Sequence, residues 1–163
     1  MTEWGMSLNV ASPDCAEEFF SGRTARCVEL HHAASLPELR AVLEARLDQV
    51  DRPVTLDLIG HSTAEHHLLR LGSTPIDMLN WSVADFFRDL AAADLLSRLG
   101  ITSVRLLGCE TAVSEAGQRT LRMLSAVLRL PVYGTSKPLM KSHSDAEGFR
   151  SAFSHLLIEA STP

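Results

Sequence analysis

Short runs of nearly continuous apolar residues alternate along this chain with longer stretches in which apolar residues recur every three or four positions. The first pattern is typical of strands buried on both faces, and the second of amphipathic helices. Strands are predicted over residues 6–11, 25–33, 53–60, 101–109 and 131–136. Strands that alternate with helices favour βαβ crossovers and a mostly parallel sheet.

The helical spacing occupies the stretches between and after these strands. Helices are predicted over residues 35–50, 81–100, 114–130 and 145–160. Ser35 and Glu38 form the capping box that begins the first helix. The second is predicted to begin with Ser82 as its cap and to end at Gly100.

Residues 66–73 predict a small hairpin or edge strand, closed by Gly72 and Pro75. The last helix is predicted to turn its apolar residues inward, namely Phe149, Phe153, Leu156 and Leu157. Together the elements predict a single α/β domain over residues 1–163, with a mostly parallel central sheet and helices on both faces.

The ends of the two most apolar strands are the places to look for chemistry. In open parallel sheets a ligand crevice lies beyond the carboxyl ends of the strands. One strand ends in Gly60-His61 and the other in Gly108-Cys109. Because neighbouring strands lie about 4.8 Å apart, His61 and Cys109 can meet if these strands pair.

Composition excludes some classes of function. The 163 residues are 45% apolar and 21% charged, an ordinary globular mixture, and the net charge is −5. A mildly acidic chain without a Lys/Arg-rich run argues against a nucleic-acid partner. No apolar run is long enough for a membrane span.

The cysteines and the first residues favour a cytoplasmic protein. Three cysteines (Cys15, Cys27 and Cys109) are an odd and sparse set, more typical of free thiols in a reducing compartment than of a disulfide framework. Residues 1–15 lack the basic start and apolar core of a secretory signal.

Cysteine and histidine together make a nucleophile and its base. The thiolate attacks, and a positioned imidazole activates the thiol and later protonates the leaving group. The helix expected to begin near Ser114 would point its N-terminus toward this pair.

The stretch "VTLDLIGHS", the later "SVRLLGCETA" and the following "PVYGT" resemble the caspase-like fold of clan CD cysteine peptidases. The resemblance spans about residues 53–136 and is closest to small bacterial caspase-like domains and the CHAT and separase branch. Caspases likewise carry a His about 50 residues before the Cys. The resemblance implies a caspase-like three-layer sandwich that acts as a cysteine endopeptidase.

The resemblance also implies individual roles. His61 would be the general base and Cys109 the nucleophile, while the backbone N–H groups of Cys109 and Ser62 would hold the oxyanion. The family usually has Gly where this chain has Ser62. The residue two before the nucleophile lines the substrate pocket in several members, and here it is Leu107.

Asp57 is a second pocket candidate, because an unpaired carboxylate inside an apolar strand would be costly. It either pairs with a buried base or lines a pocket. The implied partners are a protein or peptide substrate and a regulatory protein or a second copy of the chain, and the chemistry needs no cofactor.

Three alternatives stay open. A caspase-like fold can serve as an inactive interaction module, with Ser62 as the residue that removed activity. Residues 60–64 also fit a serine nucleophile elbow built on Ser62, with Asp77 or Asp94 and His143 as triad partners. A metal site of His61, Cys109 and His66 or His67 lacks the usual ligand spacing, so no metal is expected.

Overall fold

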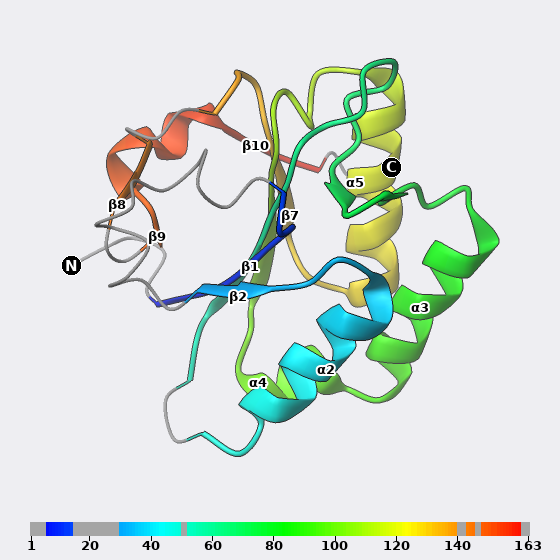
Figure 1. Ribbon diagram of the computed structural model, residues 1–163, viewed down its shortest axis with the longest axis vertical. Coiled ribbons are helices and arrows are strands. Elements are labelled where there is room, and N and C mark those ends of the chain that lie inside the picture. Colours follow the sequence, from blue (N-terminus) through cyan, green and yellow to red (C-terminus); the bar gives the residue numbers. More distant parts are fainter. Residues whose placement is uncertain (1–5, 15–29, 50–51, 140–142, 146–147, 161–163) are drawn as a thin grey trace.

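The computed structural model describes residues 6–14, 30–49, 52–139, 143–145 and 148–160. Within them a six-stranded sheet has the order β10-β7-β6-β3-β1-β2 (Figure 1). Its strands are β1 (Ser7–Ala11), β2 (Leu30–His32), β3 (Thr55–Ile59), β6 (Ser103–Leu107), β7 (Val132–Thr135) and β10 (Leu157–Glu159). Every neighbouring pair is parallel except β10 with β7. The predicted α/β class with a mostly parallel sheet is confirmed.

The α-helices of the described chain gather on one side of this sheet (Figure 1). They are α2 (Leu36–Arg46), α3 (Trp81–Ala92), α4 (Leu95–Leu99) and α5 (Glu115–Leu128). The other side carries a 3₁₀ helix, η2 (Ser151–Leu156), and a hairpin of β8 (Ser144–Asp145) and β9 (Gly148–Phe149). A second hairpin, β4 (Arg70–Leu71) with β5 (Thr74–Pro75), confirms the one predicted near residues 66–73.

The two faces of the sheet differ in chemistry because successive side chains of a strand point to opposite faces. One face is aliphatic and forms the main core with the α-helices; its buried strand residues are Leu8, Val10, Leu56, Leu58, Val104, Leu106 and Val132. The opposite positions of the three central strands include Ser7, Asn9, Asp57 and Arg105, all buried. Packing against the helices therefore stabilises one face, whereas the other depends on satisfied polar groups.

Two helix ends lie where the sequence predicted them, and one does not. Ser35 caps α2 by accepting a hydrogen bond from the Glu38 N–H, as predicted. The predicted single helix over 81–100 is wrong: Asn80 rather than Ser82 caps α3, and Asp94, in the left-handed region at φ 55°, separates α3 from α4. Asn is a strong cap, and Asp tolerates this backbone conformation better than most residues. Gly100 ends α4, as predicted.

The predicted helix over 145–160 is also wrong. This stretch contains β9, η2 and β10, and β10 pairs antiparallel with β7 from Leu157 to Glu159. A sheet edge left at β7 would expose unpaired backbone groups, and that demand outweighs a helical spacing of apolar residues. Phe149 and Leu156 are nonetheless buried, in agreement with the prediction that their side chains point inward. The predicted strand over 25–33 includes β2, and its first five residues lie outside the described residues, as do Cys15 and Cys27.

One ion pair lies in the middle of the polar face. Asp57 of β3 and Arg105 of β6 are direct partners in the strand register. The Arg105 Nε donates to Asp57 Oδ1 at 2.6 Å, and its Nη2 donates to Asp57 Oδ2 and to the Ser7 hydroxyl. Both side chains are at most 1% exposed, and the Phe149 ring lies 5.4 Å from the guanidinium carbon. Asp57 therefore pairs with a buried base, Arg105, which was one of the two outcomes expected for a carboxylate in an apolar strand.

Replacing one member of this pair is expected to destabilise the protein strongly. An Arg105→Met variant leaves the Asp57 carboxylate buried without its cation, which typically costs about 3–5 kcal/mol. The Asp57→Leu/Arg105→Met double variant should recover most of that loss. Urea unfolding followed by circular dichroism measures both. Arg88→Gln, which removes the exposed pair with Asp85, should cost about 1 kcal/mol or less and serves as the control. An Arg105→Met variant as stable as that control would contradict the assignment.

Candidate active site

The two predicted chemical residues follow neighbouring strands. β3 and β6 pair in parallel with Ile59 opposite Leu107, so the register continued by two residues places His61 opposite Cys109. Parallel strands lie about 4.8 Å apart, so both residues follow directly on neighbouring strands at the carboxyl edge of the sheet. Both residues are half-buried, and Cys109 is a free thiol. The pairing of the two strands, which the predicted site requires, is observed.

Glycines precede both residues because another chain segment crosses close by. A Cβ on Gly60 would lie 2.3 Å from the carbonyl oxygen of Arg70, a distance that real atoms do not reach. A Cβ on Gly108 would lie 2.8 Å from the Ser62 hydroxyl oxygen and from a methyl carbon of Leu69. The two glycines therefore let residues 62–70 fold back across the strand ends.

Ser62 ties the two strand ends together. Its hydroxyl donates a hydrogen bond of 2.8 Å to the backbone carbonyl of Cys109. The non-glycine residues with positive φ in the described chain are His67, Asp94, Glu110 and Arg129, so Ser62 needs no glycine conformation. The serine is thus accommodated without backbone strain, and its hydroxyl is engaged with the backbone of the cysteine turn.

The backbone around Ser62 also decides where its N–H points. Thr63 N donates to Leu68 O at 2.8 Å and Arg70 N donates to His61 O at 3.0 Å, so Ser62 and Leu69 form a non-hydrogen-bonded antiparallel pair. In such a pair the N–H groups point away from the partner strand. Within the described residues, no acceptor is bonded to the N–H of Ser62 or of Cys109. These are the two donors predicted for an oxyanion.

Two buried threonines hold the turn after Cys109. Neither was among the site residues predicted from the sequence. The Thr111 hydroxyl donates to Leu106 O at 2.8 Å, and the Thr135 hydroxyl donates to the carbonyl of Gly108. Thr135 N in turn donates to the Thr111 hydroxyl oxygen at 2.9 Å. Glu110, between Cys109 and Thr111 in the chain, has φ 57°, an uncommon backbone conformation for a residue with a side chain. The signal was a threonine near the carboxyl end of each of two apolar strands: Thr111 lies four residues after β6, and Thr135 is the last residue of β7.

The N-terminus of α5 contacts the turn that follows His61. The Ser114 hydroxyl accepts a hydrogen bond from Gly117 N, which caps the helix, and donates one to the carbonyl of His66. This contact joins the loops after β3 and β6 a second time. The first turn of α5 therefore lies against the loop that follows His61.

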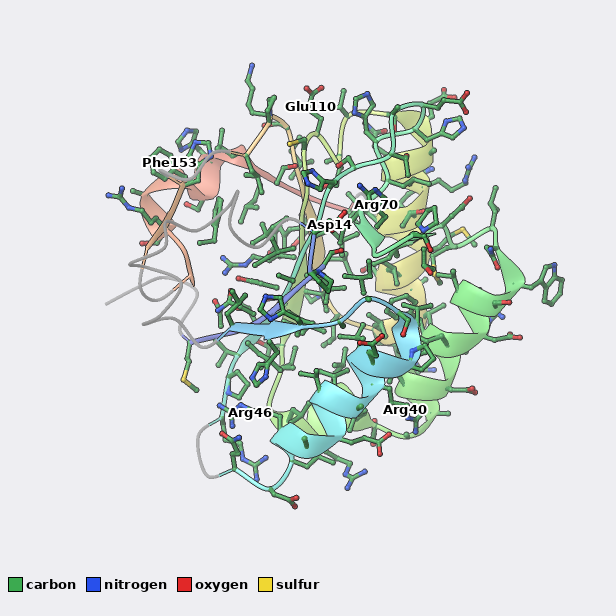
Figure 2. All side chains as sticks on the ribbon, viewed as in Figure 1. Asp14, Arg40, Arg46, Arg70, Glu110 and Phe153 are labelled. Carbon is green, nitrogen blue, oxygen red and sulfur yellow. The ribbon has the colours of Figure 1, made fainter. Side chains whose placement is uncertain are left out.

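On the other flank, β1 is connected to the β4–β5 hairpin. Arg70 Nη1 lies 2.9 Å from Asp14 Oδ2, and Figure 2 labels this pair. The Ser12 hydroxyl also bonds to Asp14 and accepts from Gly72 N at 2.8 Å. The Ser12 hydrogen bond is the main cause that lowers the pKa of Asp14 below its usual value; burial opposes it and Arg70 adds to it.

Asp57 and Leu107, the two residues predicted to line a substrate pocket, are both buried inside the protein. Asp57 is fully buried in its ion pair with Arg105. Leu107 is 2% exposed and packs with Ala11, Ile59 and Phe149 in the apolar cluster at the end of the polar face. Neither side chain reaches the surface of the described structure.

The geometry of a serine elbow is not formed at Ser62. An elbow needs a strand, a sharp turn and then a helix. Residues 62–75 instead form an isolated bridge, a turn and the β4–β5 hairpin. Of the suggested partners, Asp94 lies at the junction of α3 and α4. His143 makes an edge contact with Phe153, with ring centroids 4.6 Å apart, and Phe153 lies on the side of the sheet away from the α-helices (Figure 2).

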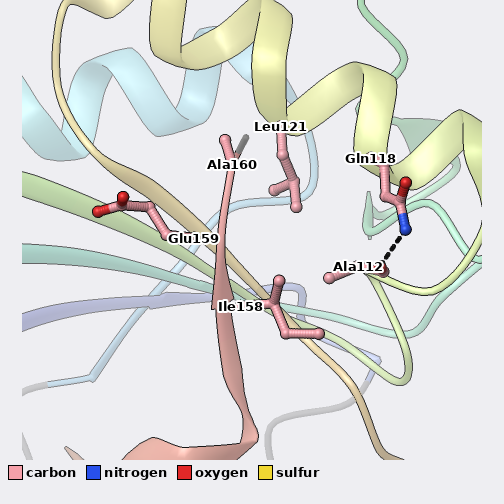
Figure 3. A pocket seen from close by; sticks show the side chains of 6 residues that line it. All are labelled: Ala112, Gln118, Leu121, Ile158, Glu159 and Ala160. Carbon is pink, nitrogen blue, oxygen red and sulfur yellow. Dashed lines mark hydrogen bonds between the residues drawn. The ribbon is translucent and has the colours of Figure 1, made fainter. Parts of the chain in front are cut away.

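A small hollow near the cysteine turn has little chemistry of its own. It measures about 170 Å³ and lies between α5 and β10 (Figure 3). Its walls are formed by Ala112, Gln118, Leu121, Ile158, Glu159 and Ala160. Gln118 is bonded to the Ala112 carbonyl, and Glu159 accepts from the Tyr133 hydroxyl. The polar side chains of the hollow thus already have partners in the protein.

The described residues form neither a metal-binding cluster nor a membrane-spanning helix. They contain no group of three or more His, Cys, Asp or Glu side chains arranged to hold a metal ion. None of their helices combines the length and apolar character needed to cross a bilayer. Comparison with models of known protein families and with characterised proteins finds no match for this chain.

The Ser62 hydrogen bond should contribute measurably to stability. A Ser62→Ala variant leaves the Cys109 carbonyl without its donor, and we expect a loss of about 1 kcal/mol in the free energy of unfolding. Urea unfolding gives the value, and Ser73→Ala in the exposed β4–β5 turn is the matched control. Equal stability of the two variants would show that the tether contributes nothing.

Proposed function

We propose that this protein is a caspase-like cysteine peptidase in which His61 and Cys109 form the catalytic dyad. One observation supports the proposal: β3 and β6 are paired neighbours with Ile59 opposite Leu107, so the same register continued by two residues would bring His61 opposite Cys109 at the carboxyl edge of the sheet. The order of the motifs, with Gly-His first and Gly-Cys second, and the resemblance over residues 53–136 support the same family.

The proposed reaction uses the side chains of His61 and Cys109 and the backbone N–H groups of Ser62 and Cys109. His61 takes the thiol proton of Cys109, and the sulfur attacks the carbonyl carbon of the peptide bond. The N–H groups of Ser62 and Cys109 donate to the oxygen that becomes negative. The C–N bond breaks as His61 returns the proton to the leaving amine. Water then hydrolyses the thioester, with His61 accepting its proton, and regenerates the thiol.

The resemblance suggests the surroundings of this activity. The substrate is a protein or peptide in the cytoplasm, and regulation comes from a partner protein or from a second copy of the chain. The mechanism as written requires no cofactor. A retained fold without turnover, in which the Ser62 side chain leaves too little room for a substrate, is the rival function.

Alkylation of the intact protein tests whether Cys109 is an activated thiol. At pH 7 with limiting iodoacetamide, Cys109 should react faster than Cys15 and Cys27, because a nearby base raises its thiolate fraction. Peptide mapping by mass spectrometry gives the three rates in one sample. His61→Gln should slow only the Cys109 reaction. Equal rates at the three cysteines would contradict the dyad.

Turnover is tested on denatured casein and on a library of internally quenched peptides. The wild-type protein should cleave members of the set, and Cys109→Ala should abolish cleavage. His61→Ala should lower kcat by roughly 10²–10⁴. His155→Ala, an exposed histidine on the far side of the sheet, is the matched control and should keep full activity. Reactive Cys109 without cleavage of any peptide would favour the inactive module.

A further inference from the structure

A pocket of about 340 Å³ lies between the turn that follows His61 and the segment that leads into α3. The residues of its wall that bear on the argument are Thr63, Glu65, His66, Leu68, Pro75 and Asp77. Thr63 is two residues after His61, so the chain allows at most about 7 Å between their Cα atoms. The pocket therefore adjoins the proposed dyad on its histidine side.

The walls of this pocket are held in place by hydrogen bonds. Thr63 bonds to Leu68 twice, through backbone N–H to carbonyl at 2.8 Å and through its side-chain oxygen, which accepts from Leu68 N at 3.1 Å. The Ser114 hydroxyl fixes the carbonyl of His66. Asp77 accepts from Leu79 N at 3.0 Å through Oδ1. A wall that is ordered before binding loses little entropy when a ligand enters.

The wall of the pocket combines apolar and acidic side chains. Leu68 and Pro75 contribute aliphatic atoms, and Glu65 and Asp77 contribute carboxylates. The Glu65 Oε2 lies 3.8 Å from the His66 Nε2, and none of the lining residues is a lysine or arginine. Long cationic side chains have the matching form, because their alkyl stems cover apolar surface while the charged head stays near anions and water.

We propose that this pocket binds a lysine or arginine side chain of the peptide substrate, on the leaving-group side of the bond that is cut. The assignment rests on the proposed function: His61 protonates the leaving amine, so the pocket built by the residues directly after His61 lies nearest that side. The exposed side chains of Leu79 and Trp81, which flank the lining residue Asn80, extend the surface for further residues of the leaving segment.

Binding is measured first, without turnover, in the Cys109→Ala variant. The probes are Nα-acetyl-lysine methylamide and its norleucine analogue, which has a similar alkyl chain without the ammonium group. In ¹H–¹⁵N spectra the lysine probe should shift the amides of residues 63–68 and 77–80 at millimolar concentration, and norleucine should bind at least threefold more weakly. Equal shifts with both probes, or shifts elsewhere, would overturn the pocket assignment.

Charge variants test whether the carboxylates of Glu65 and Asp77 contribute to lysine binding. Glu65→Gln/Asp77→Asn should weaken lysine binding roughly tenfold, since each exposed ion pair accounts for a few-fold, and added salt should weaken binding to the unaltered protein. Asp89→Asn, an exposed acidic position on α3 away from the pocket, is the matched control and should leave affinity unchanged. Identical affinities in the double variant and the control would contradict the proposal.

Cleavage data locate the pocket relative to the cut. Quenched peptides should be cleaved more efficiently by the wild type when Lys or Arg replaces Glu directly after the cut, and the Glu65→Gln/Asp77→Asn variant should lose that preference in kcat/KM. Cleavage without any such preference would overturn the proposal while the dyad stands. If no peptide is cleaved but lysine binding and its charge dependence persist, the proposed function is wrong and the cation pocket is retained.

Discussion

The buried pair of Asp57 and Arg105 fixes the register on which the site depends. These residues are direct partners on β3 and β6, and each lies four residues before a member of the proposed dyad. A shift of one residue between the strands would separate two charges in a place without water and turn the side chains of one strand to the other face. Apolar side chains alone would tolerate such a shift more easily. The ion pair thus specifies which residues meet at the carboxyl edge.

This charged pair is compatible with a stable fold because the two faces of the sheet contribute differently to stability. The aliphatic face packs on α2, α3, α4 and α5 and supplies most of the apolar burial. The polar face can then hold two charges, provided that their hydrogen bonds are made. Ser7 accepts from the guanidinium, and the Phe149 ring lies against it. The aliphatic face therefore supplies most of the stability, and the polar face specifies the register of β3 and β6.

The central strands could be predicted from the sequence because they depend on local signals. Apolar runs predicted β1, β3, β6 and β7, and the Gly-His and Gly-Cys ends of two of these runs indicated the candidate site. Features that need a distant partner were missed. The strand β10 exists because the edge of β7 must be paired, which no local spacing reveals. The partner of Asp57 lies 48 positions away, although one signal was available: each of the two runs contains a single charged residue at the matching position.

Ser62 stands where the motif that this chain resembles usually has glycine, and its backbone does not require one. The direction of its N–H is set by the antiparallel pair with Leu69, a constraint that acts on the backbone and holds for serine as well as for glycine. Its hydroxyl adds what glycine lacks, a bond to the carbonyl of Cys109 beyond the last paired residues of β3 and β6. Without this bond, the described contacts between the loops after β3 and β6 would still include the one from Ser114 to the His66 carbonyl. The serine therefore adds a second tether between these two loops, and its side chain occupies space that a glycine would leave open.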